Sequence, residues 1–300
     1  MIYTVTLNPS LDYVMHLEKL KIHLVNRSHQ EIIYPGGKGL NVSIVLNNLN
    51  IPNKALGFIA GFTGKEIERL MTDLGSNCDF ITLNEGISRI NVKVEAEGET
   101  EFNGMGPTIT GQDLEILFKK LDQIQEGDFL VLAGSIPNSV PHTIYQDIMK
   151  KLAHKNINFI VDSTKDLLLN VLKYKPFLIK PNHLELAEMF HVEIHSEEEI
   201  ITYARKLQEM GAQNVLISRG SEGAILLTNT NEILKTTAPK GTVINTVGAG
   251  DSMVAGFLAN YIETQNLHSA LEFATITGSA TAFSPWLATA DMIMGTGLKK

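Results

Sequence analysis

Short apolar runs alternate with longer segments of helical periodicity along most of the chain. The runs are apolar on both faces of an extended chain, which is typical of strands buried in a parallel sheet. The predicted strands cover residues 2–7, 55–60, 129–133, 159–161, 177–179 and 215–217. The predicted helices cover residues 40–50, 65–74, 112–123, 142–154, 165–173, 184–190, 197–210, 251–261 and 269–282. This alternation predicts an α/β fold with a mostly parallel sheet and helices on both of its faces.

Two regions break the alternation. Residues 12–17 with 30–34, and residues 89–96 with 100–102, alternate apolar and polar side chains at a period of two, which is typical of strands with one solvated face. The turn at residues 97–99 is too short for a helical crossover. We therefore expect a small antiparallel sheet that projects over the main sheet as a lid. Its strands are expected at about residues 10–17, 29–35 and 88–103.

Charge and cysteine content exclude several classes of protein. The 300 residues include 33 acidic and 25 basic side chains, a net charge of −8, which does not suit a nucleic-acid-binding surface. The single cysteine, Cys78, cannot form an intramolecular disulfide, and we expect a buried structural thiol. The N-terminal apolar run lacks a basic flank, and no apolar stretch approaches the roughly 18 residues of a membrane span. These features predict a cytoplasmic protein that binds neither membranes nor nucleic acids.

One glycine-rich segment opens a predicted helix at residues 247–251, Val-Gly-Ala-Gly-Asp. The free N–H groups and the helix dipole at such a start attract anions. Asp251 lies at the same helix start, where a carboxylate can also be a simple N-terminal cap. The segment is not a dinucleotide fingerprint, because Met253 occupies the third glycine position.

A second glycine-rich segment, residues 36–43, also opens a helix and follows a predicted lid strand. Its sequence is Gly-Gly-Lys-Gly-Leu-Asn-Val-Ser. The glycines allow the backbone to approach a ligand closely, and Asn41 offers a donor and an acceptor to hydroxyl groups. Each segment alone is a weak signal, but together they predict two facing helix starts that favour anions.

These two segments and three others resemble the motifs of the PfkB, or ribokinase-like, carbohydrate kinase family. The others are NPSLD at 8–12, KPNHLE at 180–185 and SRGSEG at 218–223, and the first segment extends to NTVGAGDSMVAGF at 245–257. The motifs follow the family's order and spacing over essentially the whole chain. The resemblance implies a ribokinase-like three-layer αβα fold and one kinase domain over residues 1–300. Within the family, the chain is most similar to the sugar-phosphate kinases, the 1-phosphofructokinases and tagatose-6-phosphate kinases.

The resemblance assigns the catalytic roles to the 247–251 segment. Asp251 would be the base that removes the proton from the attacking sugar hydroxyl. The amides of Gly248, Ala249 and Gly250 would stabilise the transferring phosphoryl group. Phosphoryl transfer relies on positioning and charge neutralisation, which such a site supplies.

The resemblance also implies residues that contact the sugar. Asp12, Gly36, Gly37 and Asn41 would hold the sugar, and Ser135 lies in a turn that these kinases carry near the substrate.

ATP and Mg²⁺ are the implied cofactors. The ATP phosphates would be held by Ser218, Arg219, Gly220, Ser221 and Gly223, with Lys180 and Asn182 nearby. Glu185 would hold Mg²⁺ through water molecules, as Mg²⁺ sites commonly do. Asn245 replaces an Asp of ribokinases, which speaks against their activation by monovalent cations.

A phosphate already present on the sugar requires cations. Arg89 and Lys38 are the predicted ligands, because a guanidinium fork matches phosphate oxygens. Arg27 is a weaker candidate, which would reach across a dimer formed by the lid. From the residue pattern alone, Arg89 also fits a solvated strand face.

Other polar residues remain less specific. His191 and His195 have helical zinc spacing but lack a third ligand, so we expect solvated or core histidines. Asp162 ends a predicted strand, where it either contacts a ligand or caps the next helix.

The resulting hypothesis is an ATP-dependent kinase that converts fructose 1-phosphate to fructose 1,6-bisphosphate and forms a homodimer through its lid. The alternatives are a tagatose-6-phosphate or fructose-6-phosphate kinase and, from another class, a non-catalytic sugar-phosphate or nucleotide sensor. The intact Asp251 argues against the sensor.

Overall fold

The computed structural model describes residues 1–163 and 165–297. Within these residues, the main sheet has nine strands in the order β13-β12-β11-β10-β9-β8-β1-β4-β5. Its strands are β1 (Ile2–Thr6), β4 (Asn53–Ala60), β5 (Ile81–Leu83), β8 (Phe129–Ala133), β9 (Asn158–Asp162), β10 (Leu178–Ile179), β11 (Asn214–Ser218), β12 (Ala224–Leu227) and β13 (Ile233–Thr236). Neighbouring strands from β11 to β5 pair in parallel, whereas β12 and β13 pair antiparallel. The predicted mostly parallel sheet is confirmed.

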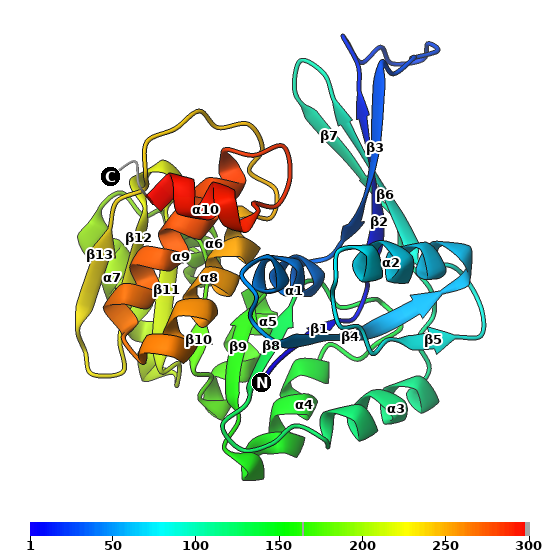
Figure 1. The fold of residues 1–300 in the computed structure, drawn as a ribbon. Helices are drawn as coiled ribbons and strands as arrows, with labels where there is room; N and C mark the ends of the chain where they lie inside the picture. The colour runs from blue at the N-terminus through cyan, green and yellow to red at the C-terminus, as the bar shows by residue number, and fades with distance from the viewer. Residues whose placement is uncertain (164, 298–300) are drawn as a thin grey trace.

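Helices cover both faces of this sheet (Figure 1). They are α1 (Lys38–Asn48), α2 (Gly61–Asp73), α3 (Gly111–Leu121), α4 (Ile144–Leu152), α5 (Lys165–Val171), α6 (His183–Phe190), α7 (Glu197–Glu209), α8 (Ala249–Thr264), α9 (Leu267–Ala282) and α10 (Ala290–Gly297). The buried side chains form two apolar clusters, one with α3 to α7 and the other with α1, α2 and α8 to α10. The three layers arise because the central strands are apolar on both faces and each face needs cover. None of the described helices is long and apolar enough to cross a membrane.

The lid is a separate sheet of the order β3-β2-β6-β7 that projects away from the main sheet (Figure 1). Its strands are β2 (Ser10–His16), β3 (Gln30–Gly36), β6 (Arg89–Glu95) and β7 (Glu99–Asn103). The β2–β3 and β6–β7 pairs are antiparallel as expected for hairpins, but β2 and β6 pair in parallel. That parallel pair is possible because the long segment between β3 and β6 passes through the main sheet before it returns to the lid.

An aromatic contact joins the lid to the C-terminal part of the chain. The ring of Tyr34, on β3, stacks on the ring of Trp286 with their centroids 4.5 Å apart and their planes at 11°. Offset stacking of this kind adds to the stability gained from burial of the rings. The contact holds one side of the lid over the edge of the main sheet where the central strands end.

Four elements were not predicted from the sequence: β5, β12, β13 and α10. The strands are three or four residues long, too short to show a period. The polar turn at residues 228–232 lies between two apolar runs, which is the signature of a hairpin. This hairpin signature would have been sufficient to predict β12 and β13 from the sequence.

Candidate active site

A cavity of about 540 Å³ lies between the lid and the carboxyl ends of the central strands. It is called the catalytic cavity below, because the predicted catalytic residues line it. Open α/β sheets bind ligands at this edge, because the loops after neighbouring parallel strands converge there. The predicted site residues that line it are Asp12, Gly37, Lys38, Asn41, Arg89, Ser135, Lys180, Asn182, Glu185, Ser218, Gly248, Gly250 and Asp251. The tertiary structure therefore gathers residues from both glycine-rich segments, the lid and the ends of β8, β10 and β11 around one space.

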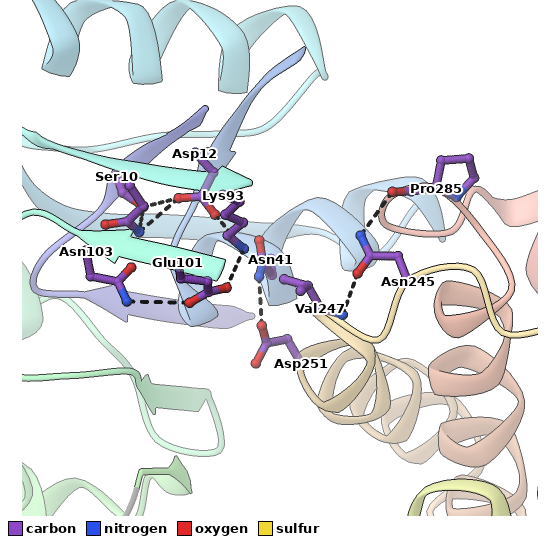
Figure 2. A network of polar contacts seen from close by, with 11 residues as sticks. Ser10, Asp12, Asn41, Lys93, Glu101, Asn103, Asn245, Val247, Asp251 and Pro285 are labelled. Atoms are coloured by element: carbon purple, nitrogen blue, oxygen red, sulfur yellow. Dashed lines mark hydrogen bonds and ion pairs between the residues drawn. The ribbon is translucent and has the colours of Figure 1, made fainter. Parts of the chain in front are cut away.

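Asp251 lies in the first turn of α8, and its side chain is 5% exposed. The helix is capped by Gly248 and not by Asp251, so the carboxylate is not the simple cap that the sequence also allowed. Asn41 Nδ2 donates to Asp251 Oδ2 at 2.8 Å (Figure 2). Burial and the nearby charge of Asp162 raise the pKa of Asp251 to about 6. A carboxylate with this pKa is a stronger base than an exposed one and is still ionised near neutral pH.

The turn before α8 forms part of the cavity wall. Gly248 has a φ of 77°, in the left-handed region, and a side chain there would meet Leu287. Gly248 and Gly250 line the cavity. The N–H of Ala249, in contrast, donates to the carbonyl of Thr246 at 3.2 Å. Of the three residues predicted to form an anion hole, Gly248 and Gly250 thus line the cavity, whereas the N–H of Ala249 holds the turn together.

A buried carboxylate links two lysines in the floor of the cavity. Asp162, which is 2% exposed, ends β9 and contacts Lys38 Nζ at 2.9 Å and Lys180 Nζ at 3.2 Å. Burial opposes the charge of Asp162, but the two ammonium groups outweigh it and hold its pKa below the ordinary value. The charge of Asp162 likewise raises the pKa of Lys38. One buried carboxylate therefore orients both lysine side chains.

Lys180 lies next to the turn before α8. A Cβ atom placed at Gly250 would lie 3.1 Å from Lys180 Nζ. The glycine thus leaves room for the ammonium group beside the amides of the turn. Positive charge and N–H donors converge at this point, as the binding of a transferring phosphoryl group requires.

The lid contributes a network around Asp12. Its Oδ1 atom accepts from Ser10 Oγ at 2.7 Å and from Asn91 Nδ2 at 3.0 Å, and its Oδ2 atom lies 3.2 Å from Lys93 Nζ (Figure 2). Gly36 does not line the cavity, but a Cβ atom there would come within 2.4 Å of Asp12 Oδ1. Gly36 is therefore required to make room for the Asp12 carboxylate.

Arg89 enters the cavity from β6. Its Nε atom donates to the carbonyl of Asn8 at 3.0 Å, which orients the guanidinium group while leaving its other nitrogens for a ligand. Burial lowers the pKa of Arg89, but a guanidinium remains charged in proteins. The same side chain lines an adjoining cavity of about 390 Å³ together with Ser135. Arg27, the weaker candidate, is exposed in the 17–29 loop and lines neither cavity.

The start of α6 fixes Asn182 and Glu185. The Asn182 side chain accepts from the backbone N–H groups of Leu184 and Glu185, and Glu185 Oε2 accepts from the backbone N–H of Asn182 at 2.8 Å. This capping box holds both side chains at the cavity wall. Ser218 lies beside Asn182 through an isolated bridge between the ends of β10 and β11.

The remainder of the 218–223 segment lies outside the catalytic cavity. Arg219 pairs with Glu197 at 2.8 Å and lines a separate cavity of about 720 Å³ next to β13. Gly220 and Gly223 have φ angles of 57° and 86°, which the tight turn around Ser221 requires. Arg219 is therefore tied to a neighbouring helix and is not directed at the catalytic cavity.

Four further residues considered in the sequence have structural surroundings of their own. Burial raises the pKa of the half-buried Cys78 thiol to about 12, which makes it a poor nucleophile. His191 ends α6 with a φ of 52°, and the exposed His195 lies 3.3 Å from Glu193. Asn245 accepts from the N–H of Val247 and donates to the carbonyl of Pro285, so its amide joins the two loops (Figure 2).

Several residues that line the catalytic cavity were not predicted from the sequence. They are Thr6, Asn8, Lys93, Ala133, Gly134, Ser163 and Val247. For Asp162, which also lines it, the sequence allowed either a ligand contact or a helix cap. A signal existed for Lys93, because Arg89 and Lys93 lie an even number of residues apart on one strand and thus share a face. Ser163 and Asp162 follow the rule that ligands bind after strand ends.

Residues 6–290 of the chain match the family model described as pfkB family carbohydrate kinase. The chain belongs to the pfkB family of carbohydrate kinases. This carbohydrate kinase is 45% identical over 293 residues to a 1-phosphofructokinase of Bacillus subtilis, which covers 98% of this chain and 96% of the relative. It is 41% identical over 288 residues to a D-tagatose-1-phosphate kinase of Bacillus licheniformis, and the match covers 96% of this chain and 94% of the relative.

A solved structure agrees with this assignment. The kinase superimposes on phosphofructokinase-2 of Escherichia coli in complex with substrates and products with a TM-score of 0.94 at 26% identity, over 99% of each chain. The predicted kinase family and ribokinase-like fold are confirmed. The tagatose kinase among these relatives is named for tagatose 1-phosphate, whereas the alternative predicted from the sequence was a tagatose-6-phosphate kinase.

Proposed function

We propose that this kinase transfers the γ-phosphoryl group of ATP to the 6-hydroxyl of fructose 1-phosphate and so forms fructose 1,6-bisphosphate. The observation that carries the proposal is the buried Asp251 carboxylate at a helix start that lines one cavity with Arg89. The B. subtilis 1-phosphofructokinase, similar over nearly the full length, supports the choice of substrate.

The chemistry follows from the residues around Asp251. The carboxylate accepts the proton of the sugar hydroxyl while the oxygen of that hydroxyl forms a bond to the γ-phosphorus of ATP. The bond from the γ-phosphorus to the bridging oxygen breaks, and ADP leaves. Gly248 and Gly250 offer N–H groups to the transferring oxygens, and Lys180 balances their negative charge. Lys38 was predicted to bind the phosphate of the sugar, but it shares Asp162 with Lys180, so we place it at the transferring group instead. These groups are held in place before the reaction, so little reorganisation is needed during transfer.

The nucleotide is expected along the ends of β10 and β11, from Lys180 and Asn182 toward Ser218. The cavity of about 720 Å³ beyond Arg219 is large enough for the remainder of the nucleotide. The 218–223 turn lies between these two spaces, which supports its predicted role beside the phosphates.

The donor groups fit a Mg²⁺ ion that is held mainly by phosphates and water. No cluster of three or more His, Cys, Asp or Glu side chains in the described part of the chain could bind a metal alone. Glu185 keeps Oε1 for a metal-bound water, since its capping contact to Asn182 uses Oε2. Mg²⁺ usually retains several waters and binds through substrate phosphates, where it would neutralise the charge of the phosphoryl group.

Replacing Glu185 by Gln is expected to raise the Mg²⁺ concentration needed for half-maximal rate and the KM for ATP, because the site loses a negative charge next to the metal's water shell. The amide oxygen of Gln can keep the capping contact, so the helix should remain intact. The KM for the sugar should change little. A Mg²⁺ titration that overlays the parent curve would limit Glu185 to its structural role at the start of α6.

Replacing Arg89 by Ala is expected to lower kcat/KM for sugar phosphates by about ten- to 150-fold, the value of a charge-assisted contact to phosphate. Unphosphorylated fructose lacks the phosphate and should be phosphorylated as slowly as by the parent. Arg69→Ala is a matched control, because Arg69 pairs with Glu66 and Asp73 on its own helix, α2, and does not line the catalytic cavity. An equal loss with fructose would show that Arg89 does not bind the phosphate.

A coupled ADP-release assay tests the proposed function on the parent protein. The panel contains the 1- and 6-phosphates of fructose and of tagatose, and fructose 1-phosphate should give the highest kcat/KM. Tagatose 1-phosphate is the second candidate, because the B. licheniformis relative is named for it. A protein that binds these sugars but releases no ADP would be the sensor.

The lid-mediated homodimer and the cytoplasmic location stay predictions. The outer face of the lid, opposite the face of Asp12, exposes Ile33, Ile90 and Phe102 at 45%, 38% and 58%. An apolar sheet face of this kind favours contact with another subunit. In that dimer Arg27 would be available to a neighbouring site.

A further inference from the structure

Lys93 is a nearly buried cation that the predicted site did not include. It lies on β6, and its side chain is 10% exposed. It lines the catalytic cavity and also a neighbouring cavity of about 270 Å³ between the lid and the C-terminal loops. Its position in the strand places it on the same face of the lid as Arg89.

The charges around Lys93 differ from those around Arg89. Lys93 Nζ lies 3.2 Å from Asp12 Oδ2 and 3.5 Å from Glu101 Oε1 (Figure 2). One cation between two carboxylates leaves a net negative charge, which repels a phosphate. Arg89 instead donates to the neutral carbonyl of Asn8. The phosphate therefore belongs near Arg89, and Lys93 faces the uncharged part of the sugar.

The hydrogen-bonding capacity of the pair leaves one donor and one acceptor. Asp12 Oδ1 already accepts from Ser10 and Asn91, which fills its two lone pairs. Asp12 Oδ2 contacts only Lys93 among these groups and keeps one lone pair. The Lys93 ammonium has three N–H groups, of which two face Asp12 and Glu101. By this count the pair, which lines the cavity, has capacity for one further acceptor and one further donor.

We propose that Lys93 and Asp12 together bind two adjacent hydroxyl groups of the sugar, with Lys93 as a specificity-determining residue. One hydroxyl donates to Asp12 Oδ2, and its neighbour accepts from Lys93 Nζ. The 3.2 Å between these two atoms is close to the separation of hydroxyl oxygens on adjacent carbons of a sugar ring. The pair thus distinguishes ketohexose phosphates by the relative orientation of neighbouring hydroxyls. This inference rests on the proposed function, because it requires a sugar substrate.

The first test compares Lys93→Met and Lys93→Arg with the parent. Lys93→Met should raise the KM for fructose 1-phosphate by about ten- to 150-fold, while kcat and the KM for ATP change much less. Lys93→Arg keeps a donor and should recover part of the loss. Lys120→Met is the control, because Lys120 also pairs with a carboxylate, Asp79, but does not line the catalytic cavity. A KM unchanged in Lys93→Met overturns the inference.

The second test pairs each variant with the 1-phosphates of 3-deoxyfructose and 4-deoxyfructose. If Lys93 binds one of these hydroxyls, the parent loses affinity for the analogue that lacks it, whereas Lys93→Met loses nothing further. The effect of the substitution and the effect of the missing hydroxyl on affinity could instead multiply for both analogues. That result would show that Lys93 contacts neither hydroxyl and would overturn the inference. Should Lys93→Met fail to fold, Lys93→Arg decides by the same criterion, since its altered donor must change the discrimination between fructose 1-phosphate and one analogue.

The parent enzyme separates the two proposals. A parent that phosphorylates no ketohexose phosphate overturns the proposed function and this inference with it. A parent that phosphorylates fructose 1-phosphate, with Lys93→Met equally effective at low sugar concentration, overturns only the role of Lys93.

Discussion

Replacing Asp251 by Asn is expected to lower kcat by about 10²- to 10⁴-fold, the contribution that general-base catalysis usually makes. Asn has the same shape, and its side-chain oxygen can still accept the contact from Asn41. It cannot take the proton of the sugar hydroxyl. The KM values for both substrates should change far less than kcat, because the lost interaction belongs to the transition state.

The pH profile gives a second measure of the same role. Asp251 must be ionised to act as a base, and burial raises its pKa to about 6. In the parent, kcat/KM should therefore fall as the pH decreases through about 6. This acidic limb should be absent from the residual activity of Asp251→Asn.

Asp147→Asn is the matched control, since Asp147 also lies in the first turn of a helix, α4, but outside the cavity. Circular dichroism should be unchanged in both variants. Near-normal turnover by Asp251→Asn would remove Asp251 from the catalytic role.

Replacing Asp162 by Asn is expected to lower the free energy of unfolding by about 3 to 5 kcal/mol, because breaking a buried ion pair from one side leaves uncompensated charge. Two ammonium groups, those of Lys38 and Lys180, lose their shared partner. The latter is only 5% exposed. Turnover should fall as well, since both lysines are oriented by this carboxylate. Urea unfolding at neutral pH, with steady-state kinetics on the folded protein, measures the two effects.

An exposed ion pair provides the control for Asp162. Asp122 lies 3.1 Å from Lys151, and their side chains are 47% and 40% exposed, so Asp122→Asn should cost less than about 1 kcal/mol. The pKa of Asp162 is held below its ordinary value of 3.8. The parent's higher free energy of unfolding, relative to Asp162→Asn, should therefore persist above that pH and disappear only in stronger acid. Equal stability of the Asp122 and Asp162 variants would contradict the buried ion-pair network.

The layers of the fold and the chemistry of the two helix starts follow from local patterns in the sequence. The central strands could be predicted because they are apolar on both faces. The lid strands could be predicted because apolar and polar side chains alternate along them. The segments at 36–43 and 247–251 carry local signals, since glycines that open a helix create donor groups within one turn. The family motifs placed Asp251 and Asn41 in one site, although 210 positions separate them.

Which polar groups meet, in contrast, depends on how separate elements pack. Asp162 and Lys93 appear in the sequence as a strand end and an ordinary strand lysine, and nothing local indicates that the first joins two cations or that the second joins two carboxylates. Arg219 belongs to a predicted phosphate-binding segment, yet Glu197, on another helix, draws it away from the catalytic cavity. Hydrophobic periodicity reflects the solvent exposure of each residue's own element, whereas ion pairs depend on how separate elements pack together, which no local pattern encodes.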